Sequence, residues 1–248
     1  MAIQIIVKGA DFSANAVDFI LPALPAGFPA GLSHANLLNK NNLVSATNLV
    51  DPGGAKATIV GTPIYSSAYG SSLDGLNYLD TTANCQTVRT MMHSFAQPAG
   101  VSSRLLGAST GLQWGIGHLS PNTLYVVAQR VTGGSPAVSY ANLLSDSILG
   151  GLNVPLRTGF VSYNTETLAL RHRVMGVSPA NTTLPGGSTF AFPNSAISIG
   201  RFTTNSPATP KRQCGFAAFW NRVLTPAEEE AAYSLVKDWG AEQGLVIS

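Results

Sequence analysis

Short apolar runs separated by turn residues dominate this sequence, and they constrain its fold more than any other feature. Runs such as KATIVG, TLYVVAQRV, GFVSYN and TLALRHRV are typical of β-strands, and PGG, GGSP and LPGGST lie between such runs as turn signals. Helical periods do not alternate with these strands, which argues against a βαβ fold. The sequence therefore predicts an all-β protein, either a sandwich or a barrel.

One helix is clearly indicated near the C-terminus. Thr225 is a suitable N-cap, Pro226 occupies the first helical position, and Glu228 completes a Thr-x-x-Glu capping box. Apolar residues recur at helical spacing from Ala232 to Trp239, which gives the helix one apolar face. This face must pack against something apolar, and the sheet is the candidate.

The first residues differ from the rest of the chain. Ile3–Gly9 is β-branched and predicts a strand, whereas Leu21–Gly31 contains several prolines and glycines that no regular strand pairing tolerates. We interpret residues 1–25 as an arm and linker for attachment or oligomer contact, and residues 26–248 as one lectin-like sandwich domain. We recognise neither a signal peptide nor a membrane span, so no membrane insertion is expected.

Charged residues are scarce, at 10% of the chain, where about 25% is typical of soluble proteins. Hydroxyl and amide residues take their place, which favours an extracellular, virion or carbohydrate-facing protein. The net charge of +2 comes without a cluster of lysine and arginine. No nucleic-acid partner is expected, because binding to the phosphate backbone requires a concentrated positive surface.

Patterns for catalysis are weak, and no catalytic residue is predicted. GASTG, around Ser109, matches the G-x-S-x-G nucleophile pattern, but no helical period follows it, so a turn is expected. A glycosidase needs two carboxyl groups at a defined separation, and no suitably spaced acidic pair occurs on one predicted strand. Two acidic residues from different strands could still lie at the separation that a glycosidase needs. The glutamates at 228–230 are explained by the helix start.

No metal site or other cofactor is predicted either. The histidines lack metal-ligand spacing and are expected to be ordinary, partly exposed residues; they are His34, His93, His118 and His172. Asp51, Asp74 and Asp80 lie in or beside loops and could supply oxygen ligands to Ca²⁺, although aspartate is also common at turns for backbone reasons. Cys85 and Cys214 are either two buried thiols or a bridge, which the sequence does not decide.

Aromatic residues supply the candidates for a ligand site. A pyranose ring packs its C–H face on an aromatic ring, while amide, carboxylate and backbone groups bind its hydroxyls. On this basis the predicted ligand-binding residues are Trp114, Tyr69, Tyr163 and Asp74. The alternative for each ring is that it fills the sandwich core, which is the expected role of Trp220.

Two stretches resemble signatures of concanavalin A-like lectin/glucanase domains of the laminin-G type. GTPIYSSAYGSSLDGLNYLDT is similar to the N-terminal signature, although Ser72 departs from its usual apolar residue, and GFAAFWNRVLTPAEEEAAY is similar to the C-terminal one. The matching positions are Leu73, Asp74, Gly75, Tyr78 and Leu79, then Asn221, Arg222, Leu224, Thr225 and Glu228. The resemblance implies a two-sheet antiparallel β-sandwich of the jelly-roll type, closed by a short C-terminal helix. Structural roles in this closure are expected for Asn221, Arg222, Thr225, Glu228 and Trp239.

KGADFSANAVDF near the start and EQGLVI at the end also look like tail-associated or receptor-binding proteins of tailed bacteriophages and prophages. Together the resemblances imply a non-catalytic virion protein that recognises a bacterial cell-surface glycan. It would assemble in the host cytoplasm and act outside the cell. The expected partners are a glycan or other host receptor, other virion proteins and further copies of the chain, as in a trimer. A purely structural virion protein and a polysaccharide-degrading glycoside hydrolase are the alternatives.

Overall fold

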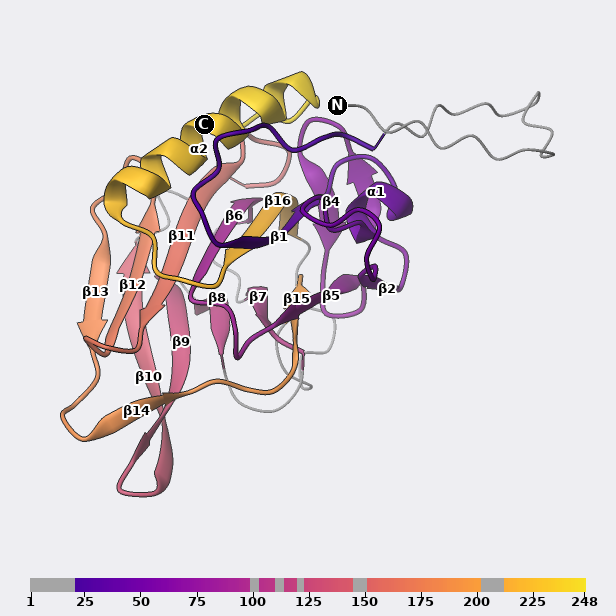
Figure 1. The fold of residues 1–248 in the computed structure, drawn as a ribbon. Helices are drawn as coiled ribbons and strands as arrows, with labels where there is room; N and C mark the ends of the chain where they lie inside the picture. The colour runs from indigo at the N-terminus through magenta and orange to yellow at the C-terminus, as the bar shows by residue number, and fades with distance from the viewer. Residues whose placement is uncertain (1–20, 99–102, 110–113, 120–122, 145–150, 202–211) are drawn as a thin grey trace, which may run out of the picture.

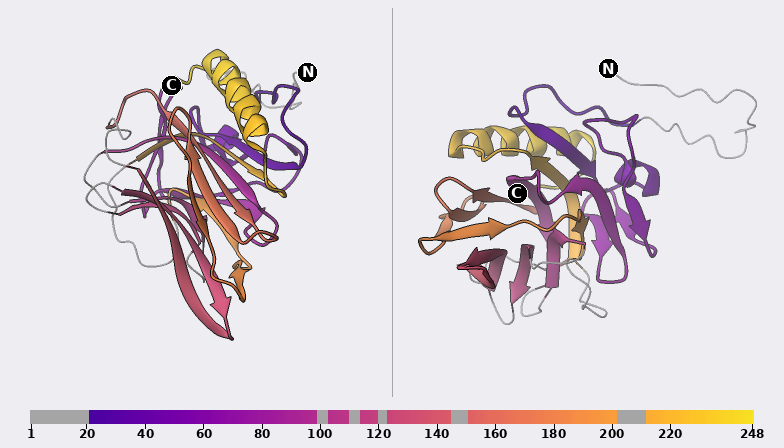
Figure 2. Two further views of the ribbon diagram at one scale, coloured as in Figure 1. Left: turned by 90° about the vertical axis from the view of Figure 1, so that its left-hand side faces the viewer. Right: turned by 60° about the horizontal axis from the view of Figure 1, so that its bottom comes forward.

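The computed structural model describes residues 21–98, 103–109, 114–119, 123–144, 151–201 and 212–248 (Figure 1). Within these residues, strands β1 to β16 form two antiparallel eight-stranded sheets that pack face to face (Figures 1 and 2). This architecture confirms the predicted two-sheet β-sandwich. A long helix follows the last strand, and a short one, α1 (Asn42–Ala46), follows the first.

The first sheet contains β1 (Leu32–Leu37), β3 (Ile64–Ser66), β4 (Gly70–Leu73), β6 (Thr90–Ala96), β11 (Arg157–Asn164), β12 (Ala169–Val174), β13 (Ala180–Thr183) and β16 (Arg212–Trp220). Its strand order is β13-β12-β11-β6-β16-β4-β3, and β1 pairs with the part of β16 that lies beyond β4. Every residue of β16 is buried, because this strand is central and covered on both faces.

The second sheet contains β2 (Thr58–Val60), β5 (Tyr78–Asn84), β7 (Ser103–Ala108), β8 (Gly115–Leu119), β9 (Thr123–Thr132), β10 (Ser135–Leu144), β14 (Ser188–Ala191) and β15 (Ala196–Ile199). Its order is β10-β9-β8-β7-β15-β5-β2, with β14 paired to β9. Because β7 and β8 are antiparallel neighbours, the chain around Ser109 leads from strand to strand. The turn expected at GASTG extends into residues 110–113, which lie outside the described residues, so it stays a prediction.

The first sheet separates two apolar cores. In β6, Met91 and Phe95 belong to the core between the sheets, whereas Met92 and Ala96 belong to an outer core beneath the helix α2 (Pro226–Glu242). Side chains on a strand alternate between its faces, so a sheet that is buried on both faces needs apolar residues at successive positions. This explains why apolar residues stand at successive positions in both strands, as in Met91–Met92 of β6 and Phe216–Trp220 of β16.

The helix α2 covers the outer face of the first sheet (Figures 1 and 2). Its start is fixed by the reciprocal capping box: Glu228 N donates to Thr225 Oγ1 at 3.3 Å, and Thr225 N donates to the Glu228 carboxylate at 2.9 Å. Arg222 Nη1 also donates to Glu228 at 3.0 Å. Near the other end, Trp239 packs edge-on against Phe216, with ring centroids 5.8 Å apart. No helix among the described residues is long and apolar enough to cross a membrane.

Residues just before β1 pack on the domain. Leu21, Leu24 and Phe28 lie against the outer core, so the last residues assigned to the arm, 21–25, contact the sandwich. The strand expected at Ile3–Gly9 falls outside the described residues. The division into arm and domain therefore stays a prediction.

Replacing Thr225 with Ala should lower the free energy of unfolding by about 1 kcal/mol, because the N–H of Glu228 loses its acceptor. Thr225→Ser keeps the hydroxyl and should stay close to the wild type. Chemical denaturation followed by tryptophan fluorescence measures both. Equal losses in the two variants would show that the cap hydroxyl does not stabilise the helix start.

Candidate functional site

Two of the aromatic residues predicted to bind a ligand stack inside the molecule. Trp114, just before β8, and Tyr163, in β11, are fully buried in the core between the sheets. Their rings stack with centroids 5.1 Å apart. They do not form an exposed surface on which a sugar could pack, and the core-filling alternative describes their position.

The aromatic stack continues outwards from these two rings. Phe192, in the connection between β14 and β15, is partly exposed and meets the Tyr163 ring edge-on at a centroid distance of 5.9 Å. The guanidinium of Arg89 lies over Phe192, with its Cζ 4.3 Å from the ring centroid. Figure 1 shows the β14–β15 connection running past the turn between β5 and β6, from which Arg89 comes. A column of side chains in contact with one another, which we call the aromatic column, thus leads from the core to the rim of the sandwich.

Amide side chains lie in the two chain segments that carry Arg89 and Phe192. Asn84 Nδ2 donates to Asn194 Oδ1 at 2.9 Å, and Asn84 Oδ1 accepts from the N–H of Gln86 at 2.8 Å. A main-chain bond of 3.0 Å from Cys85 N to Ser195 O joins the same two segments. We define the rim site as Asn84, Gln86, Arg89, Phe192 and Asn194.

Arg89 is held in a fixed orientation at the rim site. Its Nη1 donates to the carbonyl oxygens of Gln86 at 2.8 Å and Val88 at 3.0 Å. Burial lowers the pKa of Arg89, but an arginine remains protonated at neutral pH. Within the described part of the chain, its Nε and Nη2 have no hydrogen-bond partner, and Glu166 in the β11–β12 turn forms no ion pair with it. One edge of the guanidinium is therefore available to a ligand.

The other two predicted ligand-binding residues lie elsewhere. Tyr69 is partly exposed in the turn between β3 and β4, where its N–H donates to Ser66 Oγ at 3.3 Å. Asp74 is almost buried, and one oxygen of its carboxylate accepts from the N–H groups of Leu76 and Asn77, each at 2.8 Å. Asp74 thus shapes the turn that precedes β5, at the opposite end of that strand from the rim site. Neither residue joins the aromatic column.

The aspartates and cysteines form no metal centre or bridge among the described residues. No group of three or more metal-binding side chains is found there. Asp80 accepts a hydrogen bond from Ser198 Oγ within the second sheet instead. Cys85 and Cys214 are both buried and unbridged, and burial raises the pKa of each thiol to about 12.

Two histidines point into the interior, which corrects the expectation that they are partly exposed. His93 on β6 and His172 on β12 are fully buried, because they fall on the inward register of the first sheet. A β-carbon on Gly159, in β11 between them, would lie 2.9 Å from Nε2 of His93 and 3.3 Å from Nε2 of His172. Both nitrogens therefore face one point above β11, and only glycine leaves room for them.

The environment of these two rings keeps them neutral. None of their four nitrogens has a hydrogen-bond partner within the described residues. Burial lowers the pKa of His93 to about 3. Burial lowers the pKa of His172 well below its usual value, and the nearby His93 lowers it further. This pair belongs to the interior and has no part in the rim site.

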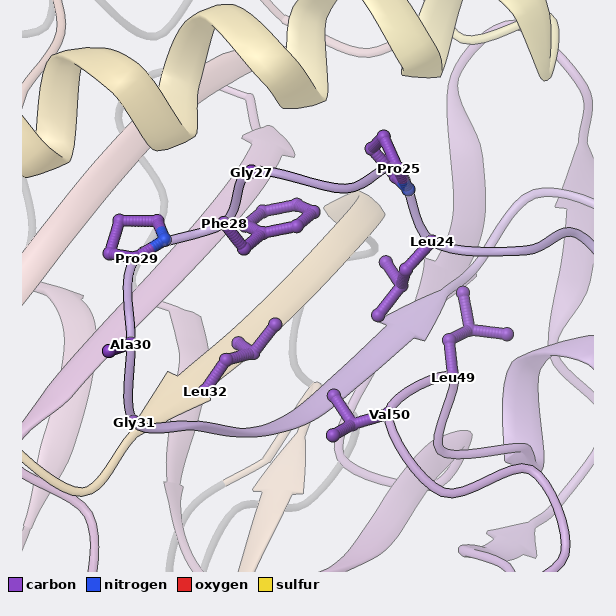
Figure 3. A pocket seen from close by; sticks show the side chains of 10 residues that line it. All are labelled: Leu24, Pro25, Gly27, Phe28, Pro29, Ala30, Gly31, Leu32, Leu49 and Val50. Carbon is purple, nitrogen blue, oxygen red and sulfur yellow. The ribbon is translucent and has the colours of Figure 1, made fainter.

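An apolar groove lies beside β1 and could be mistaken for a ligand site (Figure 3). It encloses about 400 Å³ between the segment Leu24–Leu32 and the residues Leu49 and Val50. Its side chains carry no polar group, and the Gly31 carbonyl already accepts from Asn221 N at 3.0 Å. A saccharide would find no polar side chain there to bind its hydroxyls, so the rim site suits a glycan better than the groove does.

No family model and no curated protein matches this chain. Solved structures do match: the Trypanosoma rangeli sialidase in complex with sialic acid has a TM-score of 0.55 and 15% identity, over 88% of this chain and 34% of that chain. The botulinum neurotoxin serotype C1 binding domain has a TM-score of 0.52 and 10% identity, over 82% of this chain and 51% of that chain. This chain thus spans only a third to a half of those chains. The likeness shows a shared β-sandwich fold.

Sequence reasoning missed the rim site. The amide-rich turn ANCQTVR and the segment FPNS each carry the right residue types, but each also reads as an ordinary turn. Only the pairing of β15 with β5 brings them together, through partners such as Ala196 and Asn84. An excess of asparagine and glutamine beside an arginine in one turn was the one available signal.

Proposed function

We propose that this chain is a non-catalytic glycan-binding domain and that the rim site holds the saccharide. The observation that carries this proposal is the rim site itself: an oriented arginine on an aromatic column, with amide groups of Gln86 and Asn194 beside it. Amide and guanidinium groups suit the hydroxyl and acid groups of sugars. The likeness to a sialidase solved in complex with sialic acid supports this choice of ligand class.

Phe192→Ala should weaken saccharide binding roughly tenfold, because Arg89 loses the ring that sets its plane. Tyr69→Ala is the matched control: it removes a partly exposed aromatic ring far from the rim site and should leave affinity unchanged. A glycan array with the full chain selects the saccharide, and calorimetry then compares the variants. If Tyr69→Ala abolished binding while Phe192→Ala kept it, the site would lie at the β3–β4 turn.

A polysaccharide-degrading activity is the second candidate, favoured by the sialidases among the similar structures. This chain spans only 34% of that sialidase chain, so the activity of the whole protein does not transfer to it. Release of reducing sugar or free sialic acid from bacterial polysaccharide by the purified chain would support the enzyme. Binding without product release supports the domain proposed here.

We further propose that the domain acts on a bacteriophage virion, as a tail-associated protein that meets the host surface. The support is the resemblance of the KGADFSANAVDF stretch to such proteins. Virions carrying Phe192→Ala should then adsorb less well to host cells. If adsorption is unchanged while the protein remains in the particle, the role is structural, in decoration or assembly.

A further inference from the structure

We propose that the rim site selects saccharides that carry a carboxylate, such as uronic or sialic acids, through the free edge of Arg89. This inference rests on the proposed glycan-binding function and names the ligand class of the same site. It follows from three properties of the rim site: the arginine has no carboxylate partner among the residues that the structure describes, its plane is fixed, and the neighbouring amides also offer donors.

Arg89 differs from three other arginines of this protein because no carboxylate among the described residues balances its charge. Arg171, Arg173 and Arg222 each form an ion pair with a glutamate at the start of α2. Arg89 forms none with any described residue, although it is partly buried and its pKa is lowered for that reason. A cation that has lost part of its water without gaining an anion is a site where a bound anion is favoured.

The geometry of the guanidinium suits a carboxylate in particular. Two hydrogen bonds hold one edge of the group, from Nη1 to the carbonyls of Gln86 and Val88, and the flat face lies on Phe192. The opposite edge, formed by Nε and Nη2, carries two parallel N–H donors. That edge matches the two oxygens of a planar carboxylate, which it can bind with paired hydrogen bonds.

The neighbouring amides complete a surface rich in donors. Asn194 Oδ1 is used by Asn84, which leaves the Asn194 NH₂ group without a partner among the described residues. The exposed Gln86 side chain is likewise unbonded there. These groups can donate to ring or hydroxyl oxygens of the same sugar while Arg89 binds its acid group.

The test compares acidic saccharides with their neutral counterparts on the full chain. Oligogalacturonate is measured against the same oligomer after reduction of its carboxyls to hydroxymethyl groups, and sialyllactose against lactose. At least one acidic member should bind ten times or more tightly than its neutral counterpart, with affinity falling as salt is raised. Arg89→Gln should bring that ratio close to one. Arg157→Gln, which removes the same charge from a partly exposed position in β11, should leave the ratio unchanged.

Each outcome decides between the two proposals. Equal binding of acidic and neutral saccharides, reduced by Phe192→Ala, would overturn the carboxylate preference and leave the glycan-binding function standing. Absence of binding to every saccharide would overturn both, and stronger binding of a sulfated oligosaccharide would overturn the assignment to carboxylate. Arg89→Lys separates charge from shape: it should keep the salt dependence but lose most of the preference. Melting curves of all variants exclude unfolding as the cause.

Discussion

Lowering the pH from 7.5 to 5.5 should reduce the free energy of unfolding by about 3 kcal/mol, through His93 and His172. In the unfolded chain each imidazole takes up a proton near pH 6.5. In the folded protein the pKa of His93 is about 3 and that of His172 is also far below its usual value. At pH 5.5, one unit below the unfolded pKa, each ring thus contributes about 1.4 kcal/mol to the loss.

The sign follows from which state binds more protons. The folded pKa values are depressed, so the stabilisation is complete above pH 6.5 and falls as the pH drops towards the folded values. No carboxylate contributes to either shift; burial comes first for both rings, and His93 adds to that of His172. Arg171 and Arg173 flank His172 in β12 but turn outwards to α2. Strand β9 of the second sheet also contacts β12, and its Arg130 donates to Ser188 Oγ.

Urea denaturation at pH 7.5, 6.5 and 5.5 measures this effect above the usual pKa range of carboxyl groups. Glu229 is the exception in the folded state, because burial raises its pKa. The double variant His93→Gln with His172→Gln should flatten most of the pH dependence, whatever its own stability. His34, which is partly exposed and bonds Thr82, provides the control, because His34→Gln should remove only a small part of the slope. A slope that survives in the double variant would show that other groups titrate.

Much of the fold could be predicted from local signals, because those signals act over a few residues. Turn residues divide the strands, and the capping box of Thr225 and Glu228 lies within one helical turn. Trp220 ends the apolar run Phe216–Trp220, and this run predicts that its side chain is buried, as it is. Local signals do not show which face each residue of a strand points to when both faces of that strand are covered. His93 lies on β6, which is buried along its whole length, so no alternation marks its inward position. On β12 the alternation does place His172 on the face of Leu170 and Val174, but the type of residue alone gives no reason to expect a buried histidine there.

The candidate site shows the same limit over longer distances. The sequence predicts that Trp114 and Tyr163 bind a ligand because they are aromatic, but both are fully buried, at the inner end of the column. The partly exposed end is built from Arg89 and Phe192, which are distant in sequence and meet only after the sheets have formed. Chemistry-bearing residue types could be recognised from the sequence; their assembly depends on tertiary pairing and could not.

Glu229→Ala should lower the free energy of unfolding by about 3 kcal/mol, which is a much larger effect than its position at a helix start suggests. Its side chain is fully buried between α2 and β12, where Arg171 and Arg173 both donate to its carboxylate. Burial raises the pKa of Glu229 despite these two arginines, so the charge is costly to bury. Removing the carboxylate leaves both guanidinium groups largely covered and without their common partner, which costs more than the pair contributed.

Glu230→Ala is the matched control, because Glu230 pairs with Arg173 from a half-exposed position, with 53% of its side chain accessible. Surface pairs of this kind contribute less than about 1 kcal/mol. Chemical denaturation at neutral pH compares the two variants in the same helical turn and against the same strand. If they lose similar amounts, the buried carboxylate does not hold α2 on the sheet, and apolar contacts such as Trp239 on Phe216 hold it alone. If Glu229→Ala alone causes a large loss of stability, the capping box is not the only feature that holds the start of α2. The ion pair of Glu229 with β12, more than fifty residues earlier in the chain, then holds it as well.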